Sequence, residues 1–419
     1  MHLTATSAEK NINYAIDYQC PQCGAQASLD EDARIFSCRF CRVRSLITAS
    51  PFFRYALPSN APRDRDLIYF PYWRFKGMVF VCSTSGISER FADVSLQAVG
   101  SRFFPVSVGL RSQTQSLRVL TPDLAGTFLK PIIPLKTVTD QLARRFVRDH
   151  TEAVAHEAVI GETISLIYSP FYMKDILMDG LTNTPADQGT GPAPDLPDLA
   201  REPVRTGIRF IPALCPGCGW DLDANHDALV LLCPRCETLW QASNRELKPV
   251  NSAILSREGP ADIYLPFWRI HADITGLTLN TLADLAAVAN LPMVVRKTWD
   301  STRFHFWCPA FKLRPKTFLQ TASRITLSQW RLPLERRFPK GRLFSVNLPL
   351  GQAVKSLVLI LADVMRPKTG MTSVLEKIHT VPRGSVLAWL PFRETGHEYV
   401  QDRLNLAINR TMAGLAADR

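Results

Sequence analysis

The sequence predicts an α+β fold made of two homologous halves, each a four-cysteine module followed by a mixed or antiparallel β-sheet domain with one or two helices. The C-x2-C pairs at 20–23 and 38–41 return at 215–218 and 233–236, so every cysteine is displaced by 195 positions. An aromatic, proline-containing stretch returns at the same displacement. With 46% hydrophobic and 21% charged residues, the chain has enough apolar side chains for a core in each half. These observations indicate an internal duplication.

The length of 419 residues favours two to four domains. Between the halves the chain turns to Asn, Asp, Gly and Pro, a composition typical of a linker. The predicted segments are the first module at 14–48, an α+β domain at 49–179, a linker at 180–208, the second module at 209–245, and a second α+β domain at 246–419.

Hydrophobic patterns in the first half predict several strands and one helix. Apolar positions recur near one face of a 3.6-residue period at 137–157, which favours a helix. Short apolar runs predict strands at 33–37, 67–75, 78–82, 102–119 and 164–171.

The second half repeats this order with small insertions. Strands are expected at 262–270 and 386–392, with a helix at 351–365 between them. A final helix is expected at 397–416, because Val400, Leu404 and Ile408 recur at a spacing of four.

The cysteine pairs predict two structural metal sites. Cysteine pairs of this spacing are typical of metal ligands in a reducing compartment, and two C-x2-C turns complete a tetrahedral thiolate shell. We expect two zinc ions, with a single rubredoxin-like iron as the alternative, since four thiolates also suit iron. A shell of four thiolates leaves no open position for substrate, so both sites are structural. The predicted ligands are Cys20, Cys23, Cys38 and Cys41 in the first site and Cys215, Cys218, Cys233 and Cys236 in the second.

Other residues near the cysteines receive plainer interpretations. Gly24 and Gly219 follow the second cysteine of each half and suit a turn that needs positive φ. His226 lies within the second module, but Glu31 occupies the matching position of the first, so we interpret His226 as a surface loop residue. Cys82 and Cys308 lie outside the pairs and are expected to be small buried hydrophobes.

The cysteine motifs and the strand after them resemble the CPxCG-type zinc ribbons of transcription-factor-B-like and rubredoxin-like proteins. They are similar in particular to uncharacterised bacterial zinc-ribbon proteins in which a Tyr-x-Pro-aromatic-Trp strand follows the ribbon. The matching strand residues here are Tyr69, Pro71 and Trp73, repeated as Tyr264, Pro266 and Trp268. The resemblance implies metal binding and the ribbon fold. It does not imply one particular function, because such ribbons bind nucleic acid, proteins or nothing.

Four apolar strands carry the ending aromatic-x-Pro-aromatic, at 69–72, 168–171, 264–267 and 389–392. In one interpretation, proline ends the hydrogen-bond ladder at a sheet edge while the aromatic rings pack in the core. In the other, the rings form a platform for a ligand or partner peptide. Arg74 and Arg269 follow the tryptophans and are expected to form a cation–π stack or an internal salt bridge.

The formal charge of +11 is concentrated between residues 296 and 342, where twelve Lys or Arg face only two acidic residues. Aromatic residues are interleaved with these cations, as in surfaces that bind phosphates and stack bases. On a strand, Lys312, Arg314 and Lys316 would share one face. A solvated face above core aromatics is the alternative. The residues assigned to a polyanion or partner are Arg303, Lys312, Arg314, Lys316, Arg324, Arg336, Arg337 and Lys340.

Function is the least determined property. No apolar run approaches the roughly 20 residues of a membrane span, and the N-terminus lacks signal-peptide character, so a cytoplasmic protein is expected. Nucleotide-loop, dinucleotide-fingerprint, nucleophile-elbow and metalloprotease motifs are absent from the sequence. The leading hypothesis is a non-enzymatic zinc-binding adaptor or assembly subunit with a protein partner. Nucleic-acid binding through 296–342 is the alternative, peripheral membrane contact stays open, and an enzyme with a cleft between the halves is the third hypothesis.

Overall fold

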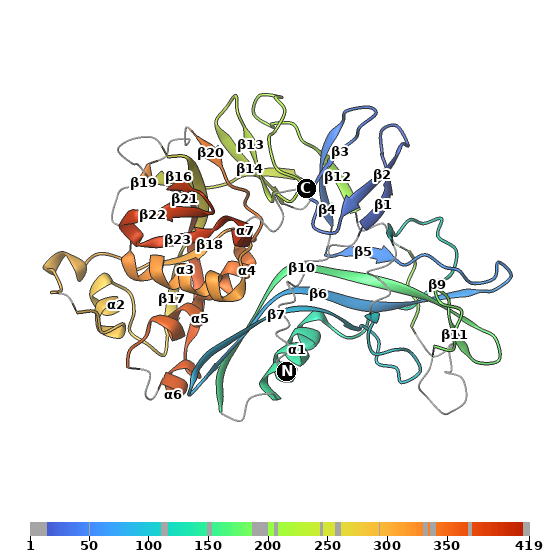
Figure 1. The fold of residues 1–419 in the computed structure, drawn as a ribbon, viewed down its shortest axis with the longest axis horizontal. Helices are drawn as coiled ribbons and strands as arrows, with labels where there is room; N and C mark the ends of the chain where they lie inside the picture. The colour runs from blue at the N-terminus through green and yellow to red at the C-terminus, as the bar shows by residue number, and fades with distance from the viewer. Residues whose placement is uncertain are drawn as a thin grey trace, which may run out of the picture.

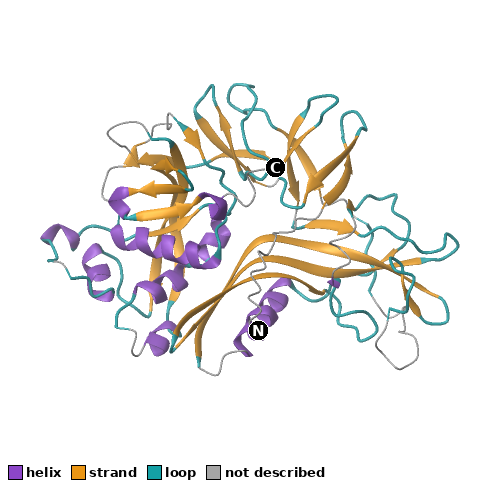
Figure 2. Cartoon of the chain, viewed as in Figure 1, coloured by secondary structure: helices purple, strands orange, loops and turns teal. Residues whose placement is uncertain are grey.

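The computed structural model describes residues 15–49, 51–109, 116–148, 153–186, 200–204, 208–243, 246–255, 261–292, 294–329, 334–335, 341–367 and 371–413. In these residues the fold is mixed α+β, with several sheets and few helices (Figures 1 and 2). The two cysteine modules lie side by side at the top of Figure 1, the long strands of the first half sweep beneath them, and most helices gather on the second half.

The first half is built on a sheet with the order β2-β1-β8-β5-β10-β6-β7, to which β9 and β11 add on β6 and β10. Its centre is the antiparallel pairing of the two longest strands with each other. The strands are β1 (Ala15–Gln19), β2 (Gln26–Asp30), β5 (Phe53–Ala56), β6 (Leu67–Ser83), β7 (Gly86–Gln97), β8 (Leu117–Val119), β9 (Thr127–Phe128), β10 (Val154–Met173) and β11 (Leu177–Asp179).

The second half is built on a sheet with the order β18-β17-β21-β16-β19. Here too a long antiparallel pair forms the centre, with β20 added in parallel on β17 and a small meander following β21. The strands are β16 (Ser252–Leu255), β17 (Ile263–Thr275), β18 (Phe306–Pro309), β19 (Leu334–Glu335), β20 (Arg342–Leu343), β21 (His379–Thr395), β22 (Glu398–Gln401) and β23 (Leu406–Asn409).

The cysteine modules contribute two three-stranded sheets, and one of these sheets contains strands from both modules. The first is formed by β3 (Ile35–Ser37), β4 (Arg44–Ala49) and β12 (Ile208–Pro212), and the second by β13 (Val230–Cys233), β14 (Thr238–Ser243) and β15 (Glu246–Pro249). The strand that opens the second module therefore pairs with the first module.

Among the described residues, α1 (Leu135–Arg148) covers the sheet of the first half, and the other helices belong to the second half (Figure 2). The helices of the second half are α2 (Leu282–Val288), η3 (Lys297–Trp299), α3 (Pro315–Ser328), α4 (Leu350–Val354), α5 (Leu357–Val364), α6 (Met371–Leu375), η4 (Asp402–Leu404) and α7 (Arg410–Ala413).

Corresponding positions of the two sheets make corresponding hydrogen bonds. The indole N–H of Trp73 donates to the carbonyl of Ile133 at 2.7 Å, just before α1. The indole N–H of Trp268, displaced by 195 residues, donates to the carbonyl of Leu348 at 2.9 Å, just before α4. Each tryptophan therefore joins its central strand to the start of the next helix.

The prolines of the aromatic strands lie in inner strands rather than at a sheet edge, which corrects the expected edge position. Pro71 is opposite Tyr168 in the β6–β10 pair, and Pro266 is opposite Trp389 in the β17–β21 pair. A neighbouring strand ends beside each proline, so its missing N–H breaks no long ladder. The aromatic residues of the four endings are buried in the core: Tyr69, Tyr72, Tyr168, Phe171, Tyr264, Phe267, Trp389 and Phe392.

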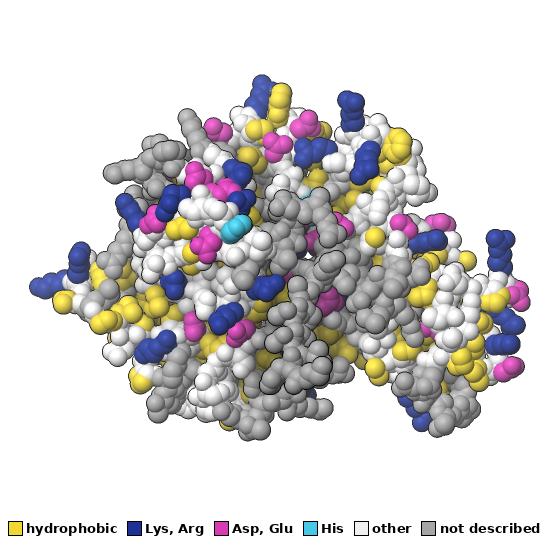
Figure 3. Space-filling model, viewed as in Figure 1, with side chains coloured by type: hydrophobic (Ala, Val, Ile, Leu, Met, Phe, Trp, Pro, Cys, Tyr) yellow, Lys and Arg dark blue, Asp and Glu magenta, His cyan; other side chains and the backbone are white. Residues whose placement is uncertain are grey.

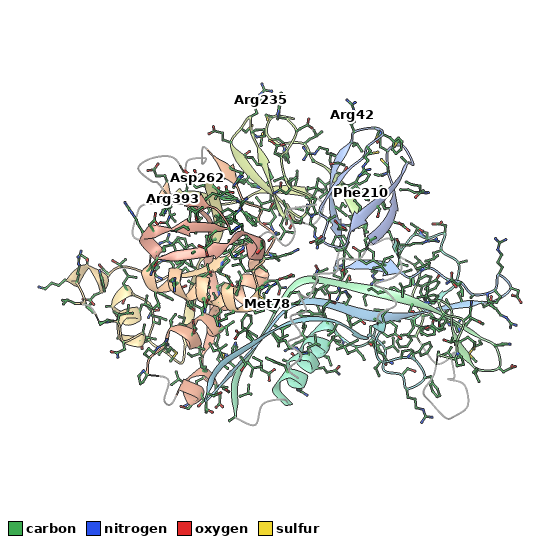
Figure 4. The ribbon with its side chains drawn as sticks, in the orientation of Figure 1. Arg42, Met78, Phe210, Arg235, Asp262 and Arg393 are labelled. Carbon is green, nitrogen blue, oxygen red and sulfur yellow. The ribbon has the colours of Figure 1, made fainter. Side chains whose placement is uncertain are left out.

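The far ends of β6 and β10 pack onto the helices of the second half, so one apolar core includes residues of both halves. Phe80 lies 6.3 Å from Phe318, measured between ring centroids. The backbone N–H of Gly161 donates to the side-chain carbonyl of Gln352 at 2.8 Å. Met78, labelled in Figure 4, belongs to the same core. At these strand ends the contact between the halves is therefore largely apolar, with one hydrogen bond, and it is continuous with the core of the second half.

Two of the expected helices are wrong in part or in whole. The helix expected at 137–157 ends at Arg148, and residues 154–157 belong to β10. The helix expected at 397–416 is replaced by β22, η4, β23 and the short α7, with residues 414–416 outside the described part. A spacing of four residues places side chains on one face of a strand as well as of a helix, so this spacing did not distinguish the two structures.

Other elements were predicted more closely. The strands expected at 67–75 and 78–82 form one strand, β6, and the helix expected at 351–365 is present as α4 and α5. Of the strand expected at 102–119, only 117–119 is a strand, and 110–115 lie outside the described residues. Cys82 and Cys308 are fully buried, as expected.

Candidate metal centres and the ionic contacts around them

The first cysteine cluster is formed by two turns of ribbon 1, the module containing β1 to β4. The Sγ atoms of Cys20 and Cys41 are 3.7 Å apart, and those of Cys23 and Cys38 are 3.6 Å apart. The N–H of Gly24 donates to the carbonyl of Cys20 at 2.8 Å and closes the first turn. Gly24 has a φ of 72°, as the sequence predicted.

The second cluster repeats this geometry in ribbon 2, the module containing β12 to β15. The Sγ atoms of Cys218 and Cys233 are 3.6 Å apart. The backbone N–H of Cys236 donates to the Sγ atom of Cys233 at 3.3 Å. Gly219 has a φ of 73° and closes its turn by donating to the carbonyl of Cys215 at 2.8 Å.

Both clusters fit a tetrahedral ion. In each, the four Sγ atoms lie within 4.8 Å of one another. A tetrahedral ion with metal–sulfur bonds of 2.3 Å requires sulfur–sulfur distances of about 3.8 Å, close to those measured here. The predicted ligands are therefore brought together in two groups of four, and both groups could hold a metal ion. The geometry does not distinguish zinc from iron.

The two ribbons pack against each other as one unit, called here the ribbon head. Figure 4 places Phe210 of β12 beside ribbon 1. Its ring stacks on Tyr18 with centroids 4.8 Å apart and meets Phe36 edge-on at 6.0 Å. Arg42 and Arg235 project outward from the two cysteine ends of the head in the same view. The two cysteine clusters therefore belong to one shared structure rather than to two separate fingers.

His226 is exposed, as predicted, but it also contacts ribbon 1. Its carbonyl accepts hydrogen bonds from the backbone N–H groups of Arg34 and Ile35, at 2.6 and 2.9 Å. Its imidazole lies within 4.8 Å of the carboxylates of Asp30 and Asp32. This contact is a tertiary one between ribbons that are far apart in the chain, so the local sequence around His226 gives no sign of it.

A buried ion pair network joins ribbon 1 to the sheet of the first half. The Arg74 guanidinium on β6 donates to both carboxylate oxygens of Asp93 on β7, with the Nη2–Oδ2 distance 3.1 Å. It also lies 3.5 Å from the carboxylate of Glu31, which reaches in from ribbon 1. Burial raises the pKa of Glu31 although Arg74 lowers it. Burial also lowers the pKa of the neighbouring Lys76. The salt bridge expected of Arg74 is present.

Ribbon 1 also contacts the second half, through Asp32, the residue that follows Glu31. The ammonium of Lys312 donates to the carboxylate of Asp32 at 3.1 Å. Burial raises the pKa of Asp32, but Lys312, together with Lys76 and His226, lowers it below its usual value. Two adjacent carboxylates, Glu31 and Asp32, therefore bind cations from different halves of the chain.

In the described residues, the corresponding turn of ribbon 2 makes a hydrogen-bonded contact in place of an ion pair. Asp227, displaced by 195 residues from Asp32, accepts a hydrogen bond of 2.6 Å from the amide of Asn347. The amide oxygen of Asn347 in turn accepts the backbone N–H of Lys312 at 2.8 Å. Ribbon 2 is therefore joined to its own half by hydrogen bonds at this turn, and Val230 and Leu239 pack into the apolar core of that half.

The residues assigned to a polyanion do not form one stripe. Lys312, Arg314 and Lys316 were expected on a strand, but Lys312 and Arg314 precede α3 and Lys316 lies in its first turn. Pro315 at the first helical position favours this start because its φ suits a helix and its missing N–H is not needed there. Arg314 and Lys316 are exposed, as is Arg303. Lys312 is engaged by Asp32.

The remaining members of the set contribute less to a continuous surface. Arg324 donates to the carbonyl of Asn405. Arg336, Arg337 and Lys340 lie outside the described residues. The described aromatic residues of the basic window belong to the core rather than to an exposed platform: Trp299, Phe304, Phe306, Trp307, Phe311 and Phe318.

Figure 3 shows cations dispersed among acidic and apolar side chains on the face that it presents. No helix of the described residues is long and apolar enough to cross a membrane. Comparison of the chain with protein-family models, with curated proteins and with solved structures gives no match.

Proposed function

We propose that the chain is a non-enzymatic, cytoplasmic zinc-binding adaptor or assembly subunit, in which two structural zinc ions hold the ribbon head in a shape that a partner protein binds. The observation that carries the proposal is the packing of both cysteine clusters into one head through the β12–β4 pairing. Closed thiolate shells have no position for a substrate, which favours a role in shape rather than catalysis.

We further propose that the halves arose by duplication of one unit. The 195-residue displacement of the cysteines and the corresponding tryptophan hydrogen bonds support this origin. On this view the second copy kept the scaffold and changed its surface, which is where a partner would distinguish the copies.

A native pull-down tests the adaptor. The tagged chain is purified from its own cells, and bound proteins are identified by mass spectrometry. Cys23→Ser, which removes one ligand, is compared with Gln22→Ser, which changes an exposed neighbour inside the same turn. We expect a stoichiometric partner with the wild type and Gln22→Ser, and its loss with Cys23→Ser. The same proteins in all three samples, or a chain that elutes alone, would count against the adaptor.

Nucleic-acid binding through residues 296–342 is the second candidate. The exposed Arg303, Arg314 and Lys316 favour it, while the engagement of Lys312 and the burial of the aromatic rings weaken it. Fluorescence anisotropy with single- and double-stranded oligonucleotides decides: salt-sensitive binding near physiological ionic strength supports this candidate, and its absence removes it.

A further inference from the structure

The two sheets keep an arginine at corresponding positions, but its surroundings differ. Arg74 on β6 is fully buried and bound by the carboxylates of Glu31 and Asp93. Arg269 on β17, displaced by 195 residues, is half-buried. Its guanidinium lies 5.8 Å from the Trp307 ring centroid and 3.2 Å from Nδ1 of His305. Among the described residues it forms no ion pair with a carboxylate.

The sheet register identifies what replaced the acidic partner. Arg74 pairs with Ser95 on β7, and the carboxylate that binds it, Asp93, lies two residues earlier. Arg269 pairs with Trp307 on β18, and His305 lies two residues earlier. The second half therefore keeps the arginine and carries an imidazole where the first half carries its carboxylate.

At two further positions, an acidic residue of the first half corresponds to a basic residue of the second half. Glu31 of ribbon 1 corresponds to His226 at the 195-residue displacement. Glu162 on β10 corresponds to Arg383 on β21 at the 221-residue displacement that relates the aromatic endings of these strands. Arg383 is engaged by Asp273, the acidic side chain on this face of β17, at 2.5 Å.

Among the described residues, the side chains around Arg269 are two imidazoles, the Trp307 indole and a second arginine. His271 lies on the same face of β17, with its ring centroid 5.8 Å from that of His305. Its Nδ1 atom is buried and has no hydrogen-bond partner in the part of the chain that the structure describes. Arg303 is exposed beside His305, whose Nδ1 lies 3.2 Å from the Arg303 carbonyl. A half-buried guanidinium without an opposite charge is costly, and an anion would relieve that cost.

We propose that Arg269, His271, Arg303 and His305 form a binding site for a small oxyanion, a carboxylate or phosphate group, that supplies beside Arg269 the negative charge which the Asp93 carboxylate supplies beside Arg74. Nδ1 of His305 lies 3.2 Å from both the Arg269 guanidinium and the Arg303 carbonyl. In the tautomer that accepts from Arg269, the other ring nitrogen carries the proton and donates to the ligand. Burial, together with Arg269, lowers the pKa of His305 to about 4, so the ring is neutral at neutral pH. The site is separate from the ribbon head, so this proposal can be tested independently of the adaptor proposal.

Isothermal titration of the full chain tests the site. Inorganic phosphate and acetate are titrated separately at fixed ionic strength, which distinguishes a phosphate from a carboxylate ligand. Saturable binding of either anion at one site is expected. Arg269→Gln should weaken it roughly 10- to 100-fold, because a charge-assisted hydrogen bond is lost. Arg90→Gln, an equal charge change at an exposed position of β7, should leave the affinity unchanged.

A second variant keeps the test decisive if Arg269→Gln unfolds. His305→Asp restores the carboxylate of the first half, so it should raise the melting temperature and abolish binding of the external anion. The proposal is overturned if neither anion binds saturably in the millimolar range. It is equally overturned if Arg90→Gln weakens binding as much as Arg269→Gln, or if His305→Asp binds the anion as the wild type does.

Discussion

The two corresponding arginines have different surroundings in the two halves. Around Arg74, ribbon 1 and β7 supply carboxylates, and the guanidinium holds the ribbon against the sheet. Around Arg269, the corresponding partner is His305, and the guanidinium keeps part of its exposure. The first half therefore uses its arginine for internal cohesion, whereas the second leaves it available to a ligand.

The largest expected difference comes from neutralising each arginine. Arg74→Gln leaves Glu31 and Asp93 without their buried cation, so unfolding free energy should fall by about 3–5 kcal/mol. Arg269→Gln removes a cation that no described carboxylate balances, and its effect should stay within about 1 kcal/mol. Urea unfolding followed by tryptophan fluorescence measures both. Equal losses of unfolding free energy in the two variants would contradict the expected difference between the two arginines.

The sequence patterns predicted the local features that occur in both halves better than the contacts that join distant segments. The eight cysteines and the positive φ of Gly24 and Gly219 follow from local chemistry, because thiolate geometry and a tight turn are written in adjacent residues. The pairing of β12 with β4 and the contacts of Glu31 and Asp32 join distant segments. Period and spacing within one segment carry no information on such contacts.

The mistaken C-terminal helix has a similar cause. Val400 lies in β22 and Ile408 in β23, and the hydrogen bonds between these strands favour a conformation that a spacing of four residues does not specify. The expected phosphate-binding stripe failed for a tertiary reason, since Lys312 is turned toward Asp32 of a ribbon that lies 280 positions earlier in the chain.

The second prediction compares the carboxylates of the two ribbon turns. Asp32→Asn weakens the contact with Lys312 and should cost about 1–3 kcal/mol at pH 7. Asp227→Asn should cost less, because its amide oxygen can still accept from Asn347. The pKa of Asp32 is lowered in the folded protein, so its contribution is present above the unfolded pKa and is lost as pH falls through the folded value.

Urea unfolding at several pH values checks this sign. The difference between the wild type and Asp32→Asn should shrink toward zero in acid, while Asp227→Asn serves as the matched control. A difference that stays constant from neutral to strongly acid pH would contradict an ionic contribution of Asp32.

The last prediction concerns the pH dependence of stability that His305 contributes. Its pKa falls from the usual 6.5 to about 4 in the folded protein, through burial and the nearby cations. The folded state therefore favours the neutral ring, and this contribution is present above about pH 6.5 and is lost as pH falls toward 4. His305→Gln should lose less stability over that interval than the wild type. Imidazole NMR that finds His305 titrating near 6.5 would reject this account of the site.

The most direct test of the central claim, that structural metal ions hold the ribbons and that ribbon 1 is the more strongly coupled copy, is a matched pair of ligand variants. Native mass spectrometry and urea unfolding are applied to Cys38→Ser and Cys233→Ser. Each variant should retain one of two metal ions, and Cys38→Ser should be the less stable, because releasing ribbon 1 leaves Arg74 and Lys312 without Glu31 and Asp32. Two ions in either variant, or greater stability of Cys38→Ser, would contradict it.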